Sequence, residues 1–550
     1  MMRFLGILSV FTFWIIAFAV GQPVTVNDPP AGTVRFVGGN FQQGGTGFVV
    51  KNVGDIIGND LLPELVITSP FADKIYIVRG QRSYPDRFDL SSFRPDIITV
   101  NGNTGSGFGF SVSALGDFNR DGWNDIAIGA PFEGDGGRVY ILKGGSLFPN
   151  TLDVSQVDRF FALILEGETG ENLGMSLGDG RDIDNDGYYE LPLPNPLATM
   201  EKDGNTYFGA AHVVYGQASF PDKVVNIHSL PPDAALTLYE PRTADGGILD
   251  FADTVNFVGD FNGDSFPDIG LFAGYTSGSP PEGRITVILG GEKRTGVYAL
   301  DQVPFPRIQI TNRLFSSGEM YIPDALTGGD LNQDGSGELA LGMSRALISG
   351  VSPTGAVLIL SGLPQGATEM IINATQSPHV SLITHGQGYT GFGSSISLFG
   401  SLIALGAPQA GSPFLPSTTR AGAVYVVDSR NLMPGTVEPV SDIADSILYG
   451  RHGGDQFGQS VTLVGDLNGD GRNELFVSSP MDRRDDGVSA YLIPLPARGG
   501  DLNGDHHYTR QDLFFFAPQW RTTQLPLGGD TAEVIGPLDL LSLLQSLSAW

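Results

Sequence analysis

The chain has 550 residues, more than one ordinary domain, and glycine fills 76 of these positions, about twice its usual share. This glycine content disfavours a mainly helical fold, whereas 41% hydrophobic and 17% charged residues exclude a globally disordered chain. The formal net charge of -29 would repel nucleic-acid phosphates, and we find no concentrated basic patch, so we expect no nucleic-acid partner.

The N-terminus has the pattern of a secretory signal peptide. Arg3 precedes an uncharged, mostly apolar stretch at 4–20 that ends in small residues and Gln22. We predict a signal peptide at residues 1–21, and a retained membrane anchor is the alternative. No later segment is long and apolar enough to span a bilayer, so we expect a secreted, extracellular or cell-surface protein with no membrane span after signal removal. The chain has no cysteine, so an exported fold must be held by core burial, to which bound metal can add.

The next segment of the chain repeats itself seven times, with units that begin near residues 47, 107, 173, 251, 321, 392 and 457. The unit at 107–131 reads GFGFSVSALGDFNRDGWNDIAIGAP. Each unit contains an alternating run, a turn that is usually acidic, and a short apolar run, and a third and a fourth apolar run follow. Four short antiparallel strands repeated seven times predict a mainly β fold, a seven-bladed β-propeller at residues 22–498.

The two ends of the repeat array indicate how the ring closes. The last unit stops after its third run, at 487–496, and an unassigned run, TVRFVGG at 33–39, precedes the first unit. We predict that this N-terminal strand completes the last blade, because closure removes the exposed edges of an open array.

The repeats resemble the FG-GAP repeats of the integrin alpha-subunit propeller. The naming motif is present at 108–109 with 129–131, and again at 392–393 with 406–408. The resemblance covers roughly residues 33–496 and implies a propeller that binds ligands in adhesion. The first unit has a disrupted acidic turn, the third has Pro194-Asn195-Pro196 in place of the GAP segment, and no inserted ligand-binding domain is evident.

Five acidic turns place side-chain oxygens at relative positions 1, 3, 5 and 9, with a backbone carbonyl available at position 7. Their residues are Asp117, Asn119, Asp121, Trp123 and Asp125; Asp182, Asp184, Asp186, Tyr188 and Glu190; Asp260, Asn262, Asp264, Phe266 and Asp268; Asp330, Asn332, Asp334, Ser336 and Glu338; and Asp466, Asn468, Asp470, Arg472 and Glu474. This alternation lets a curved loop point oxygens inward, which suits calcium.

We predict about five Ca²⁺ sites in the propeller. Magnesium fits less well because it needs a smaller, nearly octahedral shell. The alternative is a set of hairpin turns satisfied by their own backbone. Ser265 replaces the glycine expected at position 6, which makes the Asp260 turn the weakest candidate, and the sixth unit has the tight turn 399–401 instead of an acidic loop.

The C-terminal segment, residues 499–550, resembles a dockerin-type module with an EF-hand-like loop. The oxygen ligands of that loop, at positions 1, 3, 5 and 12, are Asp501, Asn503, Asp505 and Asp512. A second half, from Pro537, repeats the pattern of an apolar helix ending in tryptophan but lacks the ligand spacing, so we predict one calcium ion here. The resemblance implies a cohesin-like partner, and a plain helical hairpin packed on the propeller is the alternative.

No sequence motif identifies a catalytic centre. The seven histidines show no metalloprotease spacing, and neither a nucleophile elbow nor a phosphate-binding loop is convincing. We therefore predict that the protein is not an enzyme. The resemblance to the integrin alpha-subunit propeller implies a secreted, calcium-binding adhesion protein with a protein or glycan ligand on one propeller face. The alternative is an extracellular polysaccharide-active hydrolase or lyase, or a noncatalytic subunit of such a complex.

Overall fold

We describe the fold from a computed structural model of the chain. It describes residues 23–25, 30–38, 45–58, 60–202, 205–239, 249–275, 283–312, 324–346, 355–363, 369–372, 378–386, 388–413, 415–416, 419–481 and 487–495. The predicted signal peptide, residues 1–21, and the predicted dockerin-like module, residues 499–550, lie outside these residues.

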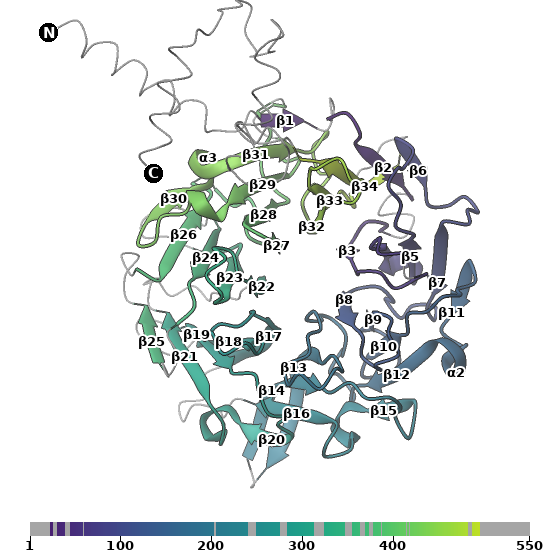
Figure 1. The fold of residues 1–550 in the computed structure, drawn as a ribbon, viewed down its shortest axis with the longest axis vertical. Helices are drawn as coiled ribbons and strands as arrows, with labels where there is room; N and C mark the ends of the chain where they lie inside the picture. The colour runs from purple at the N-terminus through teal and green to yellow at the C-terminus, as the bar shows by residue number, and fades with distance from the viewer. Residues whose placement is uncertain are drawn as a thin grey trace, which may run out of the picture. The chain divides into compact units, whose positions relative to one another are not determined.

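Seven separate β-sheets are arranged about a common axis (Figure 1), which confirms the predicted seven-bladed propeller. From the innermost strand outward, the first three blades are β3 (Val50–Asn52), β4 (Leu65–Ser69), β5 (Lys74–Val78), β7 (Ile97–Asn101) and β11 (Thr151–Asp153); β8 (Val112–Gly116), β9 (Asp125–Ala130), β10 (Arg138–Leu142), β12 (Phe161–Glu166) and β15 (Val224–Asn226); and β13 (Leu191–Lys202), β14 (Asn205–Val214), β16 (Ala235–Tyr239) and β20 (Gly296–Ala299).

The other four blades follow the same order. They are β17 (Leu249–Phe257), β18 (Ile269–Tyr275), β19 (Gly283–Ile288), β21 (Arg307–Asn312) and β25 (Glu369–Ile372); β22 (Ala325–Gly329), β23 (Glu338–Met343), β24 (Ala356–Leu360), β26 (Val380–Thr384) and β30 (Val437–Pro439); β27 (Ile396–Phe399), β28 (Leu402–Ala407), β29 (Ala423–Asp428), β31 (Ala444–Tyr449) and β1 (Pro23–Thr25); and β32 (Val461–Gly465), β33 (Glu474–Ser478), β34 (Val488–Pro494), β2 (Val34–Val37) and β6 (Arg87–Asp89).

Helices are short in the described part of the chain. The α-helices are α2 (Val157–Phe160) and α3 (Val440–Ile443), and the 3₁₀ helices are η2 (Pro70–Ala72), η3 (Ile227–Ser229), η4 (Leu300–Gln302) and η5 (Ser429–Asn431). Among the described residues, no helix has the length and apolar character needed to span a bilayer.

The N-terminal strand closes the ring as predicted. β2 pairs antiparallel with β34, the third strand of blade seven, and Val34 lies opposite Leu492. Phe36 is fully buried in this sheet, where its ring lies 5.5 Å from Phe476 and 5.3 Å from Phe88. The predicted N-terminal strand, β2, therefore belongs to the last blade, and the array has no open end.

Six blades have five strands rather than the four that the sequence predicted. The additional outer strand is parallel and comes from the chain segment of the next blade. β11, for example, follows β10 of blade two and pairs with β7 of blade one, whereas β1 of blade six precedes β2 of blade seven. These strands have only three or four residues, and in β6 and β11 a single buried residue lies between two exposed ones. Such a short segment has no detectable period, which explains why the sequence did not reveal it.

Blade three lacks its expected innermost strand. Residues 173–181 form no regular strand in the structure, although Gly178 donates its N–H to the Pro192 carbonyl at 3.0 Å. This bond shows that Pro192 directs its backbone polar atoms toward the inner edge of β13. Because Pro192 and Pro194 have no N–H, alternate positions on this edge offer acceptors but no donors, and an inner strand cannot pair regularly.

The FG and GAP residues build the contacts between blades. Phe108, Phe392 and Phe457 are fully buried. The glycine after Phe108, Gly109, has a left-handed φ of 88° and lies so close to blade one that a Cβ atom would be 2.6 Å from Ile75. The motif therefore joins a large apolar side chain to a position that only glycine can occupy.

Candidate metal centres and ligand face

The acidic turn of blade two folds around its own side-chain oxygens. Both oxygens of Asp117 accept backbone N–H groups, from Asp121 at 3.0 Å and from Gly122 at 2.8 Å. Asn119 Oδ1 accepts the Asp121 N–H at 2.9 Å, and Asp121 Oδ1 accepts the Trp123 N–H at 3.1 Å. The residues at positions 1, 3 and 5 are therefore held on the inside of one tight loop.

The turns of blades three, four and five repeat this pattern. The residue at position 5 donates its N–H to positions 1 and 3 in each of them, and the residue at position 7 donates to position 5. In blade seven, Arg472 donates its N–H to Asp470 at 2.9 Å. In blades two to five, the predicted oxygens of positions 1 and 3 thus meet at the position-5 N–H, and the position-5 oxygen accepts the position-7 N–H.

Two left-handed residues give each turn its curvature. Position 6 has positive φ in all five turns, at Gly122, Gly187, Ser265, Gly335 and Gly471. Ser265 takes this conformation with φ of 74° although it has a Cβ atom, so the blade-four turn is strained there. Position 4 is also left-handed, and its occupants are Arg120, Asn185, Gly263, Gln333 and Gly469. The sequence did not reveal position 4, because most of its residues are not glycine.

The carboxylate at position 9 differs from the other ligands because it is buried. Asp125 is fully buried and accepts N–H groups from Phe118 at 3.0 Å and Gly144 at 2.8 Å. The position-9 carboxylates of the other four turns also accept the N–H of position 2, from Ile183, Phe261, Leu331 and Leu467. Position 9 therefore fastens the start of each acidic turn to the following strand.

Burial makes these carboxylates costly to ionise in the absence of a cation. Desolvation raises the pKa of Asp125 to about 8 and that of Glu190 to about 9, and the neighbouring aspartates of each turn add to the shift. The same burial raises the pKa of Asp268 and of Glu338 to about 7. A divalent cation would compensate this accumulated negative charge.

In the blade-three turn, the positions of the carboxylate oxygens also suit a cation. One oxygen from each of Asp182, Asp184 and Glu190 lies within 4.8 Å of the other two. Glu190 Oε1 is buried and has no hydrogen-bond partner among the described residues, whereas its Oε2 accepts the Ile183 N–H at 2.8 Å. A buried carboxylate oxygen without a donor is expensive, so the donor set is suited to a hard cation.

The disrupted acidic turn of the first unit is related to the other five, although its sequence did not identify it as a candidate metal site. Glu64 is 1% exposed and accepts the N–H groups of Ile56 at 2.7 Å and Ile57 at 3.1 Å, as a position-9 carboxylate does. Burial raises its pKa to about 7. Asp55 Oδ1 is also buried without a partner in the described part of the chain. One additional residue between Asp55 and Glu64 changes the spacing of the oxygens, which explains why the sequence of this turn looks disrupted.

Blade six makes the same connection without carboxylates. Phe399 pairs with Leu402, so Gly400 and Ser401 alone form the turn, and Gly400 has φ of 53°. The prediction of a tight turn in the sixth unit is confirmed.

An aromatic row lies at the hairpin ends opposite the acidic turns. Phe48 and Phe110 precede the innermost strands of blades one and two, and Phe71 and Phe132 follow the second strands. The ring centroids are 5.9 Å apart for Phe71 and Phe48, 5.0 Å for Phe48 and Phe110, and 5.7 Å for Phe110 and Phe132. Phe71 is 51% exposed and Phe132 is 49% exposed, so the row offers apolar surface to solvent.

The C-terminal ligands predicted from the sequence, Asp501, Asn503, Asp505 and Asp512, lie outside the described residues.

Comparison with known proteins agrees with this architecture. The FG-GAP repeat model matches residues 108–142 and 457–492, which belong to blades two and seven. Integrin alpha-7 of Mus musculus is 32% identical over 204 residues, which cover 35% of this chain and 15% of that protein. The propeller is integrin alpha-like.

Two further relatives extend the comparison. Integrin alpha-PS5 of Drosophila melanogaster is 30% identical over 200 residues, covering 34% of this chain and 17% of that protein. Integrin alpha-7 of Homo sapiens is 44% identical over 145 residues, covering 24% of this chain and 11% of that protein. The chain thus matches less than a fifth of the length of these relatives, and the similarity concerns the integrin alpha-like propeller.

Proposed function

We propose that this chain is a secreted, calcium-stabilised adhesion protein whose integrin alpha-like propeller binds a protein or glycan ligand. The observation that carries the proposal is the aromatic row of Phe71, Phe48, Phe110 and Phe132. Large aromatic side chains supply much contact area in an interface, and neighbouring exposed ones form an apolar patch typical of an interaction site.

The two ends of the hairpins then have different tasks. The acidic turns hold Ca²⁺ at the oxygens of positions 1, 3, 5 and 9, and the carbonyl of position 7 completes the shell. The opposite ends carry the aromatic row. Phe48 and Phe110 lie on the segments that enter blades one and two, and Phe71 and Phe132 lie between the second and third strands of these blades. Calcium holds the inner hairpins in place, and the ligand meets the other face.

The C-terminal segment, 499–550, adds a docking function to this proposal. Its dockerin-like half, with ligands Asp501, Asn503, Asp505 and Asp512, binds one calcium ion and a cohesin-like domain. The signal peptide at 1–21 directs the protein out of the cell.

The test is a binding screen of the secreted chain against glycans, matrix proteins and cohesin domains, with calcium and with chelator. We expect calcium-dependent binding of one class that is weakened at least about tenfold in Phe71→Ser and Phe132→Ser. Phe93→Ser is the matched control, because Phe93 is an 89% exposed phenylalanine of blade one outside the row. Equal binding by all three variants would refute the aromatic face, and reducing-sugar release by the wild-type chain would identify a glycan-active enzyme instead.

A further inference from the structure

A mixed histidine and glutamate cluster lies between blades two and three, away from the acidic turns. The outer strand β15 pairs parallel with β12, so that Asn226 lies opposite Glu166. His228 follows in η3, and Asn226 caps that helix by accepting the His228 N–H at 2.9 Å. Glu168 and Glu171 follow β12 in the next loop. The fifth strand thus brings together residues that lie about sixty positions apart in the chain.

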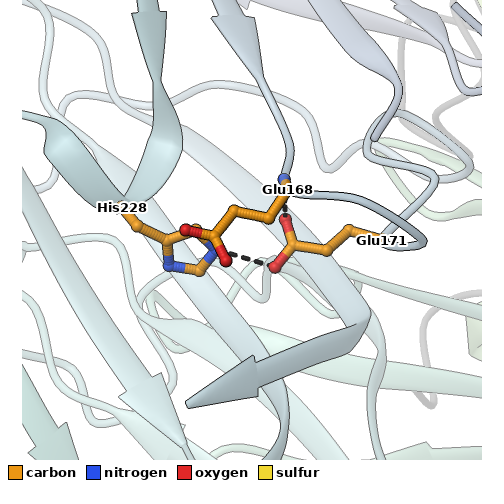
Figure 2. Close-up of side chains that lie close together, drawn as sticks. All are labelled: Glu168, Glu171 and His228. Atoms are coloured by element: carbon orange, nitrogen blue, oxygen red, sulfur yellow. Dashed lines mark hydrogen bonds and ion pairs between the residues drawn. The ribbon is translucent and has the colours of Figure 1, made fainter. Parts of the chain in front are cut away.

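The three side chains of this cluster converge on one point (Figure 2). His228 Nε2 lies 2.7 Å from Glu171 Oε1, and the Glu168 N–H donates to Glu171 Oε2 at 2.8 Å. The imidazole nitrogen and one oxygen of each glutamate all lie within 4.8 Å of one another. Glu171 is 4% exposed at its side chain and Glu168 is exposed, so the cluster has a buried side and an open side.

Two buried polar side chains border the cluster, and each has one polar atom without a hydrogen-bond partner among the described residues. Asn195 is 1% exposed; its amide donates to Glu171 Oε2 at 3.2 Å, but its Oδ1 has no partner among the described residues. His212 is fully buried, and its ring centroid lies 5.7 Å from that of His228. Its Nδ1 lies 2.9 Å from the Thr237 hydroxyl, but its Nε2 likewise has no partner within the described structure. Buried polar atoms normally have a hydrogen-bond partner, and an ordered water molecule can supply one.

The open side of the cluster faces a strongly acidic pocket. The pocket has a volume of about 560 Å³, and five carboxylates line it, namely Glu133, Asp135, Glu166, Glu168 and Glu171. Arg138 is the one cationic side chain among the described lining residues, and it already pairs with Glu133 and Glu166. The negative charge of Glu168 and Glu171 is therefore not compensated by an arginine or lysine of the pocket wall.

We propose that Glu168, Glu171 and His228 bind a transition-metal ion of the Zn²⁺ class at a site separate from the calcium turns. An imidazole nitrogen with two carboxylate oxygens suits zinc, whereas calcium takes oxygen ligands. Three protein ligands leave a coordination position toward the pocket, where water or an oxygen atom of a bound ligand completes the shell. Asn195 orients Glu171 through its amide and acts as a positioning residue.

The experiment titrates the full-length secreted chain with Zn²⁺ alone by calorimetry, in excess Ca²⁺ so that the oxygen-only turns are saturated. We expect the affinity of one Zn²⁺ per chain to fall at least about tenfold in His228→Asn and in Glu168→Gln. Glu168 is exposed, so its variant should fold even if His228→Asn does not. His379→Asn is the matched control, because His379 is a half-buried histidine of blade five outside the cluster.

A spectroscopic measurement accompanies the titration. Bound Co²⁺ replaces zinc as a probe, and its visible absorption should change in His228→Asn because a nitrogen ligand is lost, but not in His379→Asn. The proposal is overturned if excess calcium abolishes zinc binding, or if Glu168→Gln and His228→Asn bind the same number of Zn²⁺ ions with the same affinity as the wild-type chain.

Discussion

Blades two and six make the same inner hairpin in two ways. In blade two, a nine-residue segment from Asp117 to Asp125 curves around its own carboxylates, and Asp125 is fully buried. In blade six, Gly400 and Ser401 alone connect β27 to β28. Both hairpins pair antiparallel within their sheets, with one register shift between Ala114 and Gly116 in blade two, so the propeller fold does not depend on the acidic loop.

The difference shows what the acidic loop adds. The blade-two turn concentrates carboxylates, and burial makes the ionised form of Asp125 unfavourable, as its raised pKa shows. The blade-six turn has no carboxylate and therefore no such electrostatic penalty. A cation would convert this cost into stabilisation, since binding to the folded state alone raises stability. Blade one lies between the two, with a buried Glu64 and a disrupted loop.

The largest expected effect comes from removing the buried carboxylate of blade two. Asp125→Ala leaves the N–H groups of Phe118 and Gly144 without their acceptor, so we expect a loss of about 2–4 kcal/mol in the free energy of unfolding in chelator. In calcium the loss should be larger, because the turn also loses a ligand. Asp121→Ala is the comparison, because Asp121 is exposed and accepts one loop N–H.

Asp121→Ala should change stability by less than about 0.5 kcal/mol in chelator. In calcium the variant should lose the stabilisation that calcium binding at the blade-two turn provides, about 2.7 kcal/mol at a hundredfold excess over Kd. Denaturant unfolding of both variants in both conditions measures this. If Asp121→Ala responds to calcium as the wild-type chain does, then the blade-two turn is not a calcium site.

The second effect is a pH dependence that calcium reverses. Asp125, Glu190, Asp268 and Glu338 have folded-state pKa values of about 7 to 9, against ordinary values of 3.8 for Asp and 4.5 for Glu. The folded state therefore holds protons more tightly, and in chelator the stability should fall as the pH rises from about 4 to about 9. With calcium the ionised form is bound, so the calcium-induced gain should grow over the same range.

Melting temperatures across this pH range, with and without calcium, measure the reversal. Parallel pH profiles in the two conditions would show that the buried carboxylates do not contact the cation.

The smallest effect is expected in blade six. Ser401→Ala removes a hydroxyl that lies 3.4 Å from the Asp428 carboxylate and no acidic ligand, so stability should change by less than about 0.5 kcal/mol. The calcium-induced rise in melting temperature should equal that of the wild-type chain. A reduced calcium response in this variant would mean that the cation acts on the propeller as a whole rather than through individual turns.

Local spacing in the sequence was sufficient to predict the repeated part of the molecule. The FG and GAP residues and the alternating runs predicted the blades, because these signals recur in the repeated units. The run at 33–39 predicted ring closure through β2, because the last unit lacks a fourth run and this run precedes the first unit. The spacing also predicts inward oxygens at positions 1, 3 and 5 of the acidic turns, since a tight turn places alternate side chains on its inner side.

The tertiary structure alone decided the features that have no period. The outer strands have three or four residues and often one buried side chain, so only pairing with the neighbouring blade identifies them. Two prolines without N–H donors removed the inner strand of blade three. The additional residue in the blade-one turn moves Glu64 out of the regular position-9 spacing, so only the structure shows its role. Burial in the fold raises the pKa of the position-9 carboxylates and of Glu64, and spacing alone does not predict burial. The cluster of Glu168, Glu171 and His228 exists because β15 pairs with β12, a backbone contact between distant segments that no local pattern encodes.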